Sequence, residues 1–152
     1  MPNKFSKENI LNFLKNVSVM SIAVNLNGKP ISSVVTFAVD QDFSFYFVTK
    51  RETFKSRALQ KDPRISLSVW EHNKMLIQAY GTVREITDRK ESENIVKTVL
   101  QTVSRIPNYW WPIFATEEGE HISYKIQTEW LRVLDLSNSI PKGQQRFFEI
   151  HK

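Results

Sequence analysis

The chain contains no cysteine among its 152 residues, which excludes disulfides, thiolate catalysis and Cys-ligated metal centres. Its four glycines form none of the glycine-rich phosphate-binding or nucleophile motifs. The three histidines, His72, His121 and His151, lie far apart with no partner at metal-ligand spacing, so no metal site is predicted. No run approaches about 18 apolar residues, and the first residues lack the apolar core of a signal peptide. We therefore expect a cytoplasmic protein that does not contact a membrane.

The composition is that of one globular domain, large enough to bury a core without disulfides. The formal charge of +5 allows two interpretations, a nucleic-acid-binding barrel or a mildly basic protein that favours anionic small molecules. The basic residues are spread along the chain, and the aromatic residues near them follow strand patterns that predict burial. This placement favours a small-molecule partner and predicts no nucleic-acid binding.

Local signals predict a helix and a three-stranded meander in the first third of the chain. Residues 1–17 have Ser6 as a helix N-cap, followed by apolar residues at helical spacing. Asn27-Gly28 is a strong hairpin signal between a strand at 19–25 and a strand at 30–39. A tight turn at 40–42 then leads into a strand at 43–49.

The rest of the chain predicts further short strands and one longer helix. Strands are expected at 64–70 and 75–86, the second with a bulge or close backbone approach at Gly81. Asp88 begins a helix whose apolar face is expected to pack on a sheet. Residues 106–119 look irregular, 121–126 and 130–136 look like two last strands, and the C-terminal tail, 137–152, has no clear period. Six or seven short strands with tight turns, one intervening short helix and one longer packed helix predict a mainly β (α+β) fold, a small antiparallel barrel with flanking helices formed by one domain over 1–152.

One segment, residues 43–69, is the most informative part of the chain. An aromatic strand ends in a basic turn, Thr53 is placed to cap a short helix, and a β-branched strand follows Pro63. Cationic and hydroxyl side chains beside a helix N-terminus form an anion site, here for the phosphate of a small ligand. The residues that gather there are Thr49, Lys50, Lys55, Ser56 and Arg57. The alternative is a solvated basic helix face.

The same segment resembles the phosphate-binding segment of the FMN-binding split-barrel family that includes pyridoxamine 5′-phosphate oxidase. The matching features, in order, are Phe47-Val48-Thr49, Lys55, Leu59 and the run Asp62-Pro63-Arg64-Ile65-Ser66-Leu67. The resemblance covers about residues 10–136 and implies a split β-barrel with flanking helices.

By position, the resemblance implies two groups of FMN-binding residues. Ser33, Val34, Val35 and Thr36 would border the flavin ring and ribityl chain, and Val48, Thr49, Lys50 and Lys55 would hold the phosphate end. Members of the family commonly have arginines where this chain has Ser33 and Phe54; Arg51 or Arg57 would then supply the charge.

The resemblance also implies a homodimer with flavin at the subunit interface, where Trp110 or Trp111 would complete the site, core packing being the alternative. The Arg-x-His signature that grips the substrate of the oxidases is absent from the C-terminal tail. We therefore expect an FMN-binding flavoprotein, an oxidoreductase acting on a small organic molecule. The alternative is a protein of the same fold that binds or stores F420 or haem without flavin turnover.

Overall fold

The computed structural model of the chain describes residues 5–104, 120–137 and 147–152. These described residues form three helices and eight strands: α1 (Lys7–Lys15), β1 (Val19–Leu26), β2 (Lys29–Thr36), β3 (Ala38–Val39), β4 (Phe45–Lys50), α2 (Phe54–Lys61), β5 (Arg64–Glu71), β6 (Met75–Glu85), α3 (Arg89–Val103), β7 (His121–Asp135) and β8 (Phe147–His151). The fold is mainly antiparallel β, as the sequence predicted.

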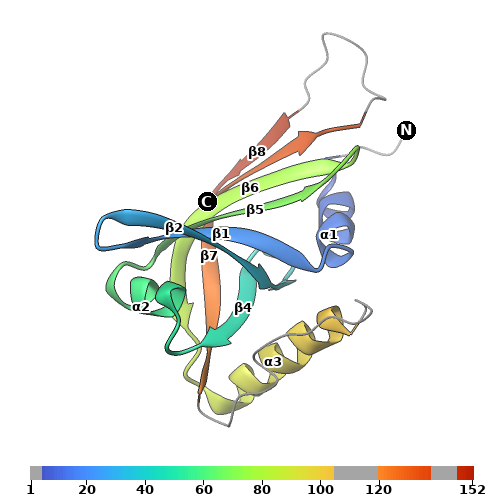
Figure 1. The fold of residues 1–152 in the computed structure, drawn as a ribbon. Coiled ribbons are helices and arrows are strands. Elements are labelled where there is room, and N and C mark those ends of the chain that lie inside the picture. Colours follow the sequence, from blue (N-terminus) through green and yellow to red (C-terminus); the bar gives the residue numbers. More distant parts are fainter. Residues whose placement is uncertain (1–4, 105–119, 138–146) are drawn as a thin grey trace.

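The strands form one curled antiparallel sheet with the order β2-β1-β5-β6-β7-β4-β3, and β8 pairs with β7 (Figure 1). β2 and β4 contact one another but form no ladder, so the barrel is open between them. This opening confirms the split barrel that the family resemblance implies.

The local signals that predicted the first helix and hairpin are borne out. The Ser6 side chain accepts a hydrogen bond from the backbone N–H of Asn9, 3.2 Å away, and so caps α1. Asn27 and Gly28 both have positive φ, 52° and 79°, as a type I′ turn requires, and they join β1 to β2.

Gly81 also has the predicted role. The β6–β7 register shifts between Tyr80 and Gly81, which marks a bulge. A Cβ atom on Gly81 would lie 1.9 Å from the carbonyl oxygen of Gln127, so β7 leaves room only for glycine there. The bulge lets two long strands bend around the core.

Three predictions about strands were wrong. The strand expected at 30–39 is interrupted at Phe37, which separates β2 from β3. The two strands expected at 121–126 and 130–136 are one strand, β7, which continues through the bulge. The C-terminal tail contains β8, which is a strand because it pairs with β7 and not because of its own pattern.

The main core lies inside the curled sheet and is closed by α1 and α2. It contains Phe45 and Phe47 of β4, Ile77 of β6, and Ala58 and Leu59 of α2, all at most 3% exposed. α3 lies on the outer side of the sheet, where it contacts β4 and β7 (Figure 1). Only Val99 and Val103 of its predicted apolar face are fully buried.

Across the described parts of the chain, no helix combines the length and apolarity that crossing a membrane requires.

Candidate functional site

The candidate phosphate site is the turn from Thr49 to Lys55, which joins β4 to α2. We call it the phosphate turn. The Thr53 hydroxyl donates a hydrogen bond to the Lys50 carbonyl (3.0 Å) and accepts one from the backbone N–H of Ser56 (3.2 Å). Its oxygen also lies 3.4 Å from the Thr49 hydroxyl oxygen. Thr53 is therefore the predicted N-cap, and it fixes the direction in which the first turn of α2 points.

Lys55 is the unusual cation of this turn. Its side chain is half-buried, and this burial lowers the pKa of its ammonium group. Lys55 forms no ion pair with any of the residues that the structure describes, and the first turn of α2 contains no acidic residue. A desolvated cation without a carboxylate partner, beside the positive end of a helix, favours an anionic ligand.

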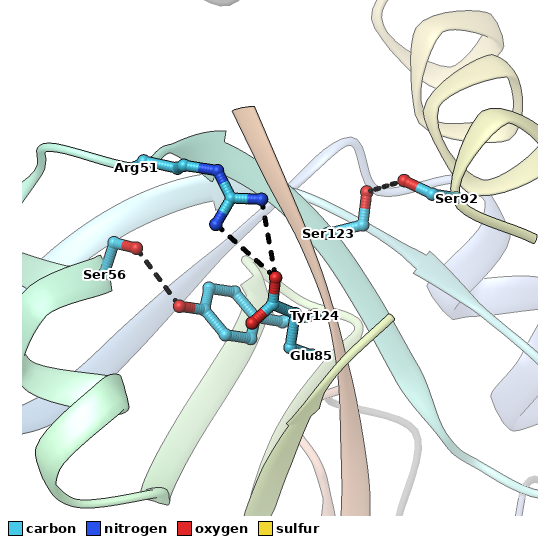
Figure 2. A network of polar contacts seen from close by, with 6 residues as sticks. All are labelled: Arg51, Ser56, Glu85, Ser92, Ser123 and Tyr124. Atoms are coloured by element: carbon cyan, nitrogen blue, oxygen red, sulfur yellow. Dashed lines mark hydrogen bonds and ion pairs between the residues drawn. The ribbon is translucent and has the colours of Figure 1, made fainter. Parts of the chain in front are cut away.

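A buried hydrogen bond holds the first turn of α2 on the sheet. The hydroxyl oxygens of Ser56 and Tyr124 lie 3.1 Å apart, and both residues are at most 2% exposed. Burial raises the pKa of the Tyr124 phenol, so the phenol stays neutral. The Tyr124 ring also packs on Phe47 with centroids 5.3 Å apart. Figure 2 shows Tyr124 directed from β7 toward α2, so the pair positions the residue next to Ser56, which is Lys55.

The second group of predicted residues, 33–36, lies at the end of β2, an edge strand of the described sheet. Val35 points into the main core, whereas Val34 is 65% exposed on the other face. Thr36 is fully buried, and its hydroxyl has no hydrogen-bond partner in the structure. An edge strand presents backbone N–H and C=O groups that no neighbouring strand uses. Residues 33–36 thus offer main-chain groups and one hydroxyl to a ligand.

The structure brings these two groups of residues to neighbouring strands, because β2 and β4 contact one another. Thr49, Lys50 and Lys55 share the phosphate turn. Val48 is 2% exposed and stands opposite Ser123 on the sheet face toward α3, so its side chain is buried in packing. Trp111 lies outside the described residues, as does Trp110.

The two arginines expected to supply charge have other contacts. The Arg51 guanidinium lies 3.5 Å from the Glu85 carboxylate, at the end of β6 (Figure 2). The Arg57 guanidinium lies over the exposed ring of Phe54, 4.8 Å from its centroid. Lys50 and Lys55 are the half-buried cations of the phosphate turn, whereas Arg51 and Arg57 are exposed. No sequence pattern indicated the Arg51–Glu85 pair or the Ser56–Tyr124 bond, because each joins residues far apart in the chain.

An antiparallel barrel that is open between two strands, with a helix-capped turn at the end of one of them, defines the class of split-barrel proteins. The family model described as pyridoxamine 5′-phosphate oxidase matches residues 6–123, which is most of the chain. The chain therefore belongs to the pyridoxamine 5′-phosphate oxidase family.

Solved structures with this fold have varied descriptions. A candidate pyridoxamine 5′-phosphate oxidase from Listeria innocua is 17% identical, with a TM-score of 0.67 over 85% of this chain and 98% of that one. A haem-binding protein from Mycobacterium smegmatis is 13% identical, with a TM-score of 0.72 over 99% of this chain and 59% of the other. A candidate 5-nitroimidazole antibiotic resistance protein from Bacteroides thetaiotaomicron is 13% identical, with a TM-score of 0.68 over 85% and 83% of the two chains. A search of the curated proteins found no match. At these identities the neighbours show the fold and leave the ligand open.

Proposed function

We propose that the protein is an FMN-binding flavoprotein, an oxidoreductase that acts on a small organic molecule in the cytoplasm. The observation that carries the proposal is Lys55, a half-buried cation without a carboxylate partner among the described residues. It stands beside the Thr53-capped N-terminus of α2. A phosphate monoester is the kind of anion that such a site accepts, through charge-assisted hydrogen bonds.

The residues present suit FMN in two respects. The phosphate turn supplies Lys55, the Thr49 hydroxyl and the backbone N–H groups at the start of α2. The edge of β2 supplies backbone groups, and the Thr36 hydroxyl is a buried polar group that still has no partner. When bound, FMN would supply the electron-transfer chemistry, and the chain's own residues would bind and orient it.

A homodimer with flavin at the interface is part of this proposal. The outer sheet face near residues 33–36 exposes Val34 (65%), Trp70 (61%) and Tyr80 (48%). Two small residues lie on the same face. Ser21 is the partner of Val34 in the β1–β2 register, and Ser66 is the partner of Tyr80 in the β5–β6 register. A sheet face with exposed large apolar side chains is suited to covering by another protein surface. Because Val34 belongs to both the face and the flavin-ring segment, a second copy covering this face would enclose the cofactor.

The test is a titration of ligand-free protein with FMN and, in parallel, with riboflavin, which lacks the phosphate. A charge-assisted phosphate contact of about 1.5–3 kcal/mol predicts that FMN binds about ten- to a hundredfold more tightly. Loss of the visible absorbance of bound FMN on addition of NADH or NADPH would then identify flavin turnover. Equal affinities for FMN and riboflavin, or no binding of either, would contradict the proposal.

Haem and F420 are the alternatives on the same barrel, and the Mycobacterium smegmatis neighbour is a haem-binding protein. Haem requires an axial ligand, and of the three histidines only His121 is half-buried, whereas His72 and His151 are exposed. The absorption spectrum of the purified protein separates the three cofactors, because haem, FMN and F420 absorb differently. Mass spectrometry of the molecule released on denaturation identifies the one that is bound.

A further inference from the structure

A cleft of about 670 Å³ lies on the side of α3 that faces the ends of β4, β6 and β7. We call it the α3 cleft. The residues proposed to bind FMN do not line it, but Arg51 of the phosphate turn, which pairs with Glu85, is one of its lining residues. The volume falls in the range of small-molecule sites, about 300–1,000 Å³. The cleft is therefore large enough for an organic ligand of its own.

The walls of the α3 cleft are apolar on both sides. Val96 and Leu100 line it from α3, one helical turn apart, and both are only half-buried. The sheet side contributes Ile86, which follows β6. The sequence pattern predicted that the apolar face of α3 packs on the sheet, but this part of it faces the cleft instead. A cleft with apolar walls between a helix and a sheet is suited to the hydrophobic part of a small ligand.

A hydrogen bond fixes the two walls relative to one another. The hydroxyl oxygens of Ser92 on α3 and Ser123 on β7 lie 3.0 Å apart (Figure 2). Ser123 is 1% exposed, and both serines line the cleft. Val99 and Val103 anchor the C-terminal half of α3. The cleft is thus held open by packed and bonded elements at both ends of the helix.

The charges that line the cleft are not balanced. Its two acidic residues are each paired with an arginine of the lining, Glu85 with Arg51 at 3.5 Å and Glu93 with Arg89 at 3.1 Å. Lys97, which also lines the cleft, has no acidic partner in the described part of the chain. Pairing therefore leaves the lining with an excess of positive charge.

We propose that the α3 cleft binds a small aromatic anion, a carboxylate or sulfonate, at a site separate from the flavin. The apolar walls would cover the ring system, and Lys97 would hold the acidic group. His121, half-buried at the start of β7, lines the cleft and would donate a hydrogen bond to the same group. The proposal does not depend on the identity of the cofactor.

The experiment compares two fluorescent probes that differ in charge, the anion anilinonaphthalene sulfonate and its neutral counterpart N-phenylnaphthylamine. Lys97→Gln should lower the affinity for the anionic probe roughly two- to fivefold, which is the effect of losing one exposed ion pair. The affinity for the neutral probe should not change. Lys90→Gln is the matched control, because Lys90 is exposed on the same helix, carries the same charge and does not line the cleft. Val96→Trp, which places a large side chain in the cleft, should lower the affinity for both probes.

The outcomes decide the proposal in each case. Equal effects of Lys97→Gln and Lys90→Gln would overturn it, as would a folded Val96→Trp protein that binds both probes normally. If the tryptophan variant does not fold, the comparison of the two lysine variants decides alone. Saturating FMN should leave the affinity for the anion unchanged, and displacement of the anion by FMN would show that the cleft is the flavin site. If FMN does not bind at all, the flavin proposal fails and the cleft is judged on the two probes.

Discussion

Replacing Lys55 by alanine tests the proposed cofactor site most directly. In the folded protein its ammonium group is half-buried at the start of α2 without an acidic partner among the described residues, and its pKa is lowered by this burial. Burial takes the Lys55 ammonium group partly out of water, and the negative charge of a phosphate at this position would stabilise it. Loss of such a charge-assisted contact is worth about 1.5–3 kcal/mol, so FMN affinity should fall about ten- to a hundredfold.

The stability of the ligand-free protein should respond differently. A lysine whose pKa is lower in the folded state than in the unfolded state binds its proton more weakly when folded. Its charge therefore slightly destabilises the fold at neutral pH, and stability rises as the pH increases through the interval between the two pKa values. The free energy of unfolding of Lys55→Ala, measured by urea denaturation, should equal or slightly exceed that of the parent protein.

The assay is flavin fluorescence during titration with FMN and riboflavin. Lys61→Ala is the control, since Lys61 is exposed in the last turn of the same helix. FMN affinity of the parent should also fall as the pH rises through the lowered pKa of Lys55, and the alanine variant should lack this dependence. Equal losses in Lys55→Ala and Lys61→Ala, or an equal loss of riboflavin binding in Lys55→Ala, would refute the assignment.

Three further substitutions test the surroundings of this site. Tyr124→Phe removes the bond to Ser56 and should lower the free energy of unfolding by about 1 kcal/mol, with weaker FMN binding and unchanged riboflavin binding in the same titrations. Gly81→Ala places a Cβ atom 1.9 Å from the Gln127 carbonyl oxygen and should destabilise the fold by about 1–3 kcal/mol or more in urea denaturation. Trp70→Arg, on the exposed sheet face, should produce a folded monomer in analytical ultracentrifugation, whereas an unchanged mass would remove this face from the proposed interface.

Features that depend on a few neighbouring residues could be predicted from the sequence. Thr53 caps α2 and Asp88 caps α3 because each hydroxyl or carboxylate bonds a backbone N–H three residues on, which needs no information from the rest of the chain. The Asn27-Gly28 turn is likewise fixed by the positive φ values that these two residues tolerate. The position of the phosphate turn followed from such signals.

Features that depend on partners distant in the sequence were missed. Residues 127–129 are polar and read as a break between two strands, but Thr128 turns inward and donates a hydrogen bond of 2.6 Å to the Phe43 carbonyl. This buried contact lets β7 continue through its bulge. In β8, Phe147, Phe148 and Glu149 are all exposed, so no alternation marked the strand, and only its pairing with β7 defines it. Tertiary pairing outweighed local pattern in both places.

The long strand β7 connects the two proposed sites. Successive residues of a strand point to opposite faces, so Tyr124 reaches α2 while Ser123 reaches α3 (Figure 2). β4 pairs alongside, with Lys50 opposite His121, so one face of this two-stranded wall supports the phosphate turn and the other borders the α3 cleft. The helix that carries Lys55 and the helix that carries Lys97 are therefore bonded to adjacent residues of the same strand, Tyr124 and Ser123, on its two opposite faces.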